Sequence, residues 1–111
     1  MATLYKFDGD WNFLTLSVQE VKPEGRRRKF RIDELRKHVD GKEIALIVQD
    51  GNIYVVDRKV KESLDKGFER PYYPYNNRAL EESGYKLIGV DDYKNFYGNV
   101  LVCKIDEIMS I

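Results

Sequence analysis

The chain has 111 residues, of which 42% are hydrophobic, 13% aromatic and 34% charged, and its 19 acidic and 19 basic residues cancel to a formal net charge of zero. A chain of this length can bury about two thirds of its surface, and this apolar fraction excludes intrinsic disorder, so we predict one globular domain over residues 1–111. The sequence has no apolar run near the roughly 20 residues of a membrane span, no signal-peptide layout in residues 1–8 and one cysteine, which favours a cytoplasmic or otherwise intracellular protein without membrane contact or a disulfide framework.

The N-terminal third predicts a hairpin followed by a charged strand. Asp8-Gly9 separates two strand-like segments, Thr3–Phe7 and Trp11–Val18, and residues of this type favour tight turns between strands. The Pro-Gly segment 22–25 predicts a turn after the second strand. Residues 26–31 are then expected to form an exposed or edge strand, because charged side chains crowd both of its faces.

A short helix is predicted next. Asp33 is a suitable N-cap, Leu35 and Val39 lie four residues apart on one helical face, and Gly41 follows as the C-terminal stop.

The strongest structural signal is a second hairpin. β-branched residues flank Asp50-Gly51 in the segments 43–49 and 52–57, a pattern typical of a hairpin with an Asp-Gly turn. Both segments are apolar on both faces, which predicts central strands covered on each side.

The C-terminal half predicts two helices and two strands. A short helix is expected at 59–66, and Asn76 or Asn77 should cap another helix that ends at Gly84. The two strands are expected at Tyr85–Val90 and Asn99–Ile105, and a terminal turn should follow them. Together the elements predict an α+β fold with a mainly antiparallel five- or six-stranded sheet centred on the 43–57 hairpin and two or three short helices. A small, partly open β-barrel is the alternative.

The sequence gives little support to catalysis. His38 is the only histidine, which excludes a histidine-based metal site or a Ser-His-Asp triad within one chain, and we expect it at the surface. Cys103 lies in an apolar strand, where cysteine acts as a small hydrophobe. No phosphate-binding glycine loop is present. We therefore predict no catalytic residue, no metal ligand and no cofactor, and keep a small metal-dependent hydrolase or nuclease, built on paired acidic residues, as the last alternative.

The segment Arg70–Arg78 is the most informative part of the sequence, because it gathers three tyrosines, two prolines and two arginines. Proline stiffens the backbone, and tyrosine and arginine are enriched in protein–protein contacts. Tyrosines also stack on unpaired bases, so binding of single-stranded nucleic acid is one alternative. A purely structural role is another, in which the segment folds over the sheet and buries its rings. The predicted partner-binding residues are Arg70, Tyr72, Tyr73, Tyr75 and Arg78.

A second candidate surface is basic. Residues 22–42 carry nine Lys/Arg against four acids, whereas residues 79–111 carry three lysines against six acids. In a strand over 26–31, the side chains of Arg27, Lys29 and Arg31 would share one face at about 6–7 Å spacing, close to the separation of phosphates in a nucleic acid. The structural alternative is a charged edge strand that resists edge-to-edge pairing.

Zero net charge and an acidic C-terminal third favour a protein partner over nucleic acid. We therefore predict a non-enzymatic binding or regulatory module that recognises another protein, including a second copy of itself, through the segment 70–78. Nucleic-acid or nucleotide binding through residues 26–31 is the alternative. No segment carries the motif of a known family.

Overall fold

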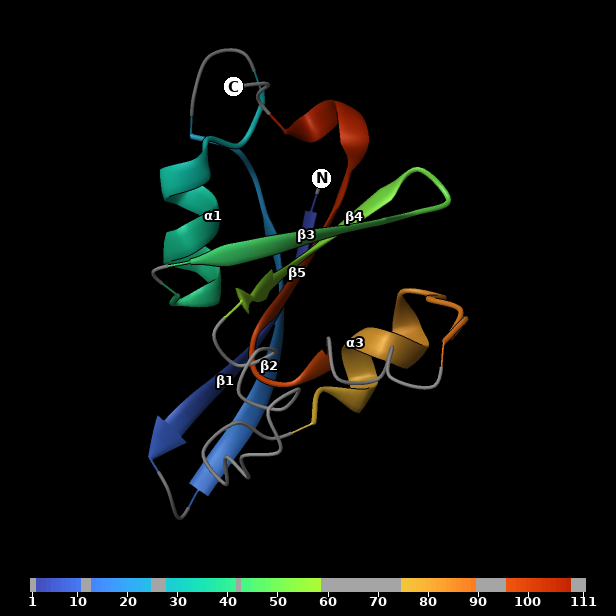
Figure 1. Cartoon of the computed structure of the whole chain (residues 1–111). Coiled ribbons are helices and arrows are strands. Elements are labelled where there is room, and N and C mark those ends of the chain that lie inside the picture. Colours follow the sequence, from blue (N-terminus) through green and yellow to red (C-terminus); the bar gives the residue numbers. More distant parts are fainter. Residues whose placement is uncertain are drawn as a thin grey trace.

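The structure is a computed structural model of the whole chain, and it describes residues 2–10, 13–24, 28–41, 43–58, 75–89 and 96–108. These residues form a mixed α+β fold that is mostly sheet (Figure 1). Its elements are β1 (Ala2–Asp10), β2 (Phe13–Val21), α1 (Ile32–Val39), β3 (Ile44–Gln49), β4 (Asn52–Asp57), α3 (Asn77–Glu82), β5 (Val100–Lys104) and the 3-10 turn η2 (Ile105–Glu107). Among the described helices, none has the length and apolar character needed to cross a membrane.

The five strands form one open antiparallel sheet in the order β2-β1-β5-β4-β3. The predicted antiparallel α+β fold is therefore confirmed, and the described strands do not close into a barrel. β5 comes from the C-terminal part of the chain but lies at the centre, where it pairs with β1 on one side and with β4 on the other. It thus joins the two sequence-local hairpins into one sheet.

The prediction that the 43–57 hairpin forms the centre of the sheet is wrong, because β3 lies at an edge. Its neighbour β4 is buried at four consecutive residues, as a central strand should be. In contrast, Leu46 and Val48 of β3 are 44% and 59% exposed. Both strands are mostly apolar, and β4 differs from β3 in pairing with β5 on its second side.

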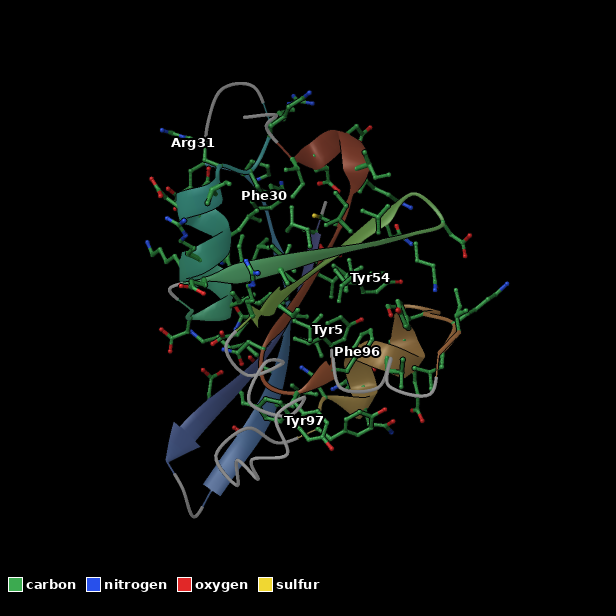
Figure 2. The ribbon with its side chains drawn as sticks, viewed as in Figure 1. Tyr5, Phe30, Arg31, Tyr54, Phe96 and Tyr97 are labelled. Atoms are coloured by element: carbon green, nitrogen blue, oxygen red, sulfur yellow. The ribbon has the colours of Figure 1, made fainter. Side chains whose placement is uncertain are left out.

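Each face of the sheet carries its own apolar core. On one face Leu4, Val55 and Leu101 pack with Phe30 and with Leu35 and Val39 of α1. On the opposite face the core gathers Tyr5, Tyr54, Val56, Val100 and Phe96 with Ala79 of α3. Figure 2 shows Tyr5, Tyr54 and Phe96 together beside α3, and Phe30 beside α1. The sheet is therefore covered on both faces, by α1 and by α3.

The first hairpin is confirmed, but its strands are longer than predicted. Asp8 pairs with Thr15 and Gly9 with Leu14, so the Asp8-Gly9 pair lies inside the ladder, which continues to Asp10 and Phe13. Asp8 finds its partner across the ladder instead of in a turn, since Ser17 Oγ donates to its carboxylate at 3.0 Å. β2 ends at Val21, where the predicted turn begins.

Helix α1 begins earlier than predicted, and the strand expected before it does not form in the described residues 28–31. Of these residues only Phe30 makes a β-bridge, to Ile108. Arg31, and not Asp33, is the N-cap residue, and its backbone N–H donates to the Glu34 carboxylate at 3.3 Å. The buried Glu34 also accepts from the backbone N–H of Glu24 at 2.9 Å. Glu34 therefore fixes both the start of α1 and the turn before it, which competes with a strand.

At the other end of α1, Asp40 adopts the left-handed conformation with φ 57°, and the Gly41 N–H donates to the Arg36 carbonyl at 3.1 Å. The space beside position 41 is limited by a side chain of β4. A Cβ on Gly41 would lie 3.1 Å from the Asp57 carboxyl group.

The predicted turn between β3 and β4 is confirmed. Gln49 pairs with Asn52, and Asp50 and Gly51 have φ values of 52° and 80°. Two consecutive positive φ angles define the type I′ turn whose twist matches that of paired strands.

Replacing Gly51 with alanine is expected to cost about 1 kcal/mol of unfolding free energy, because an alanine resists a positive φ. No atom lies within 4 Å of a Cβ built at this position, so the cost comes from the backbone alone. Gly51→Asn should cost less, since asparagine tolerates this conformation. Urea unfolding of both variants checks the difference, and equal losses would contradict the backbone explanation.

Further along the chain, helix α3 is confirmed with Asn76 as its cap, and β5 with the turn η2 matches the predicted last strand and terminal turn. The strand predicted at 85–90 is absent over its described part, 85–89. There the Gln49 side chain binds the backbone of Lys86, donating to its carbonyl at 2.8 Å and accepting from its N–H at 2.7 Å. The backbone of Lys86 therefore bonds to a side-chain amide and not to a neighbouring strand. The helix predicted at 59–66 lies outside the described residues.

Candidate functional site

The described end of the segment Arg70–Arg78 is held in place by one buried asparagine, Asn76. The Asn76 Nδ2 group donates to the carbonyls of Tyr5, at 3.2 Å, and of Gly98, at 2.8 Å. Its Oδ1 accepts from the Ala79 N–H at 3.2 Å, which caps α3, and its backbone N–H donates to the Phe96 carbonyl at 2.6 Å. One fully buried side chain therefore ties β1, α3 and the segment 96–98 together.

Two tyrosines lie side by side next to this anchor. Tyr75 forms an antiparallel β-bridge with Tyr97, and their ring centroids are 5.2 Å apart. Both residues are half-buried, so each contributes both to packing and to the surface. Burial raises the pKa of Tyr75, and Tyr97 and Glu81 raise it further. The Tyr75 hydroxyl therefore stays protonated at neutral pH and remains a hydrogen-bond donor.

Arg78 lies on the first turn of α3, two residues after the anchor, and its side chain is 53% exposed. It forms an ion pair with Glu82 one turn further along the helix. Exposed pairs at this spacing contribute little to stability, so a partner can compete for the guanidinium at low cost. We call Tyr75, Arg78 and Tyr97 the tyrosine surface.

Of the five predicted partner-binding residues, the tyrosine surface contains Tyr75 and Arg78, and Arg70, Tyr72 and Tyr73 lie outside the described residues. Tyr97 was not among the predicted partner-binding residues. The sequence indicated only that Tyr93, Phe96 and Tyr97 would enlarge the aromatic surface if they lay at the same end of the sheet as the segment 70–78. The bridge between residues 75 and 97 is a long-range contact that no local pattern encodes.

Two basic residues of the region 22–42 line a cleft. Lys22, Pro23, Arg28 and Glu107 line a cleft of about 470 Å³. Two hydrogen bonds hold residues next to its lining in the chain: Glu34 accepts from the Glu24 N–H at 2.9 Å, and the Phe30 N–H donates to the Glu107 carbonyl at 2.6 Å. Two exposed cations and one carboxylate thus share a small, anchored space.

The predicted anion-binding line of Arg27, Lys29 and Arg31 has a different geometry. Arg27 lies outside the described residues, and no strand places the other two at regular spacing. Lys29 is exposed, whereas the Arg31 Nε lies 3.9 Å from a Glu34 carboxylate oxygen. Figure 2 shows Arg31 directed outward beside α1. Lys22 was counted in the basic region but was not predicted as a site residue, because the cleft it lines also includes Glu107 from the other end of the chain.

The remaining chemically active residues do not form a described cluster. In the part of the chain that the structure describes, no three His, Cys, Asp or Glu side chains are placed to hold a metal ion. Glu81 accepts from the Asn77 amide at 3.0 Å and Glu82 pairs with Arg78, while Asp91 and Asp92 lie outside the described residues. His38 is half-buried, with its ring centroid 6.0 Å from that of Phe30, and burial lowers its pKa.

Cys103 is buried in β5, where burial raises its pKa to about 12. At pH 8 the thiol is therefore expected to resist alkylation by iodoacetamide in the native protein and to react fully in denaturant, because only the thiolate is the nucleophile. Mass spectrometry of samples quenched over several hours measures this difference. Rapid labelling under native conditions would contradict the buried placement.

Comparison of this chain with protein-family models, with curated proteins and with solved structures gives no significant match. The site must therefore be interpreted from its own geometry.

Proposed function

We propose that the protein is a non-enzymatic binding module that recognises another protein through the segment 70–78 and the tyrosine surface. The observation that carries this proposal is the anchoring of Asn76, whose side chain makes three hydrogen bonds in the interior. Residues 75–78, which are held by Asn76, lose little entropy when they bind, and preorganisation of this kind favours affinity. Tyr75, Tyr97 and Arg78 supply the rigid aromatic and guanidinium contacts that are enriched at the centres of protein interfaces.

The choice of a protein partner over nucleic acid rests on charge. Arg78 is accompanied by Glu81 and Glu82 on the same helix, which weakens attraction to a polyanion. The chain as a whole has no net charge. A surface of mixed charge with tyrosine rings suits a protein partner, and its affinity should depend on the tyrosines and only mildly on salt.

Capture from nuclease-treated source lysate, followed by titration of the purified partner, tests the proposal. Arg78→Ala and Glu82→Ala form a matched pair, because each breaks the same exposed ion pair and only the first removes the proposed contact. We expect Arg78→Ala to weaken binding at least about tenfold and Glu82→Ala to leave it nearly unchanged. The triple variant Tyr72→Ala/Tyr73→Ala/Tyr75→Ala should abolish capture. Equal capture of the same partner by the wild type and the triple variant, with thermal unfolding showing both folded, would refute the role of this segment.

A second function, the binding of an anionic ligand, is favoured by the cleft that Lys22 and Arg28 line. The two cations that line this cleft outnumber its one carboxylate, Glu107, and would attract phosphate or a nucleic-acid backbone; such binding falls steeply with salt. Titration with a fluorescent single-stranded oligonucleotide at two salt concentrations tests it. Arg28→Ala should weaken binding while Arg36→Ala, an exposed arginine on α1 paired with Asp33, should not. Identical losses from both variants would indicate only diffuse attraction.

A further inference from the structure

Among the described strands, β3 lies at one edge of the sheet and has a neighbour on one side only. In a two-residue hairpin the residues flanking the turn form a hydrogen-bonded pair, so Gln49, Ile47 and Ala45 direct their peptide groups toward β4. The Arg58 N–H donates to the Glu43 carbonyl at 3.1 Å, which continues the same alternation. The peptide groups of Ile44, Leu46 and Val48 therefore point away from the sheet. Within the described residues none of them takes part in a hydrogen bond outside the strand ladder.

Two apolar side chains along this edge are exposed to solvent. Val48 and Leu46 are 59% and 44% exposed, although their ladder neighbours on β4, Ile53 and Val55, are buried. The six residues of β3 contain no charge and no proline, and the register with β4 runs without a bulge. Proteins usually prevent an edge strand from pairing by placing a charge, a proline or a bulge in it. An edge strand without these features is available to pair with another strand.

The opposite edge of the sheet differs. β2 exposes polar side chains, among them Thr15, Gln19 and the charged Glu20, and Ser17 and Thr15 donate hydrogen bonds to groups of β1. The open apolar edge is therefore specific to β3 and not a general property of this sheet.

We propose that β3 pairs in antiparallel orientation with β3 of a second copy of the chain, around a two-fold axis at Leu46. This register places Leu46 opposite Leu46 of the second copy, and Ile44 opposite its Val48. All three outward residues then become hydrogen-bonded pairs, and the two five-stranded sheets join into one continuous sheet.

A second copy fits this edge because β3 is complementary to itself. With the axis at Leu46, aliphatic side chains meet aliphatic side chains on both faces, Ile44 with Val48 on one and Ala45 with Ile47 on the other. No ionised side chain falls among residues 44–48, so pairing over these positions desolvates no charge; Gln49 falls opposite the exposed Glu43 of the second copy. Because a single strand pair is small beside the roughly 1,600 Å² of a standard interface, we expect a dimer with micromolar affinity.

Sedimentation velocity over about 10 to 500 µM protein tests the proposal, since this range brackets a micromolar dissociation constant. The wild type should shift from its chain mass of 13.1 kDa toward twice that mass as concentration rises. Val48→Lys places a charge in the proposed pairing and should weaken the dimer at least about tenfold. Val18→Lys is the matched control, because Val18 is also exposed (37%) but lies on β2 at the other edge, and it should dimerise like the wild type.

A cysteine at the proposed axis tests the register. Residues of a hydrogen-bonded antiparallel pair have Cα atoms about 5.5 Å apart, within the span of a disulfide. Leu46→Cys should therefore form a disulfide-linked dimer under mild oxidation, while Val18→Cys should not. The native Cys103 is buried and should not contribute.

Three results would overturn the proposal: a wild type that stays monomeric over the whole range, a dimer that Val48→Lys leaves intact, or a monomer that binds a foreign extended peptide along residues 44–48. The last result would assign the edge to another protein. Thermal unfolding of Val48→Lys verifies that the variant is folded. The β3 edge is separate from the tyrosine surface, so Arg78→Ala should leave the dimer unchanged whether or not the proposed function holds.

Discussion

Replacing Asn76 with alanine is expected to lower the free energy of unfolding by about 2–4 kcal/mol. The substitution removes the cap of α3, worth about 1 kcal/mol, and leaves the carbonyls of Tyr5 and Gly98 without their donor in the interior. Unpaired buried groups cost about 1–3 kcal/mol because they have lost water without gaining a partner. Chemical denaturation followed by circular dichroism measures the loss.

Asn77→Ala is the matched control for this prediction. Asn77 is the same residue type one position later, but it is exposed and its amide contacts only the Glu81 side chain in the described structure. Its replacement should change the unfolding free energy by less than about 0.5 kcal/mol. If the two variants lose similar amounts, Asn76 does not act as the anchor of the tyrosine surface.

Replacing Phe30 with alanine should cost about 3–5 kcal/mol, the usual range for removing a large ring from a core. Phe30 is fully buried on the α1 face of the sheet, and its ring lies edge-to-face with that of His38. Its backbone also holds the basic segment against the C-terminal turn, through the β-bridge to Ile108. Loss of the ring should therefore destabilise the whole domain, as equilibrium unfolding in urea would measure.

Lys29→Ala provides the comparison for Phe30, because Lys29 is the preceding residue and is exposed. We expect it to be neutral within about 0.5 kcal/mol. A loss below about 1 kcal/mol for Phe30→Ala would show that the ring is not a core residue and would remove the support for the cleft beside it.

The contrast between Phe30 and its neighbours shows where sequence analysis fails. Charged side chains on both faces of residues 26–31 predicted an exposed or edge strand. In the structure Phe30 packs into the core, and the buried Glu34 accepts hydrogen bonds from the backbone N–H groups of Glu24 and Arg31. A buried carboxylate in a charged stretch cannot be distinguished from exposed ones without knowing which backbone groups lie nearby.

The Tyr75–Tyr97 contact and the cleft at Arg28 were beyond prediction for the same reason. Each joins residues that are far apart in the chain, and their proximity depends on how β5 enters the sheet. In contrast, the cap at Asn76 was predicted because a helix cap is a local interaction between a side chain and the backbone three residues later. The two long-range hydrogen bonds of the same side chain were not predicted.

The sequence by itself determined the local elements of this protein: the Asp50-Gly51 hairpin, the capped helix after Asn76, the strand at Val100–Lys104 and the antiparallel α+β class. Turn dihedrals, caps and periodicity act over a few residues, so local sequence is sufficient for them. Only the tertiary structure decided that β5 lies at the centre and β3 at the edge. The position of an apolar strand in a sheet depends on which other strands pair with it, and these can come from distant parts of the chain. That order leaves Leu46 and Val48 exposed and open to a partner.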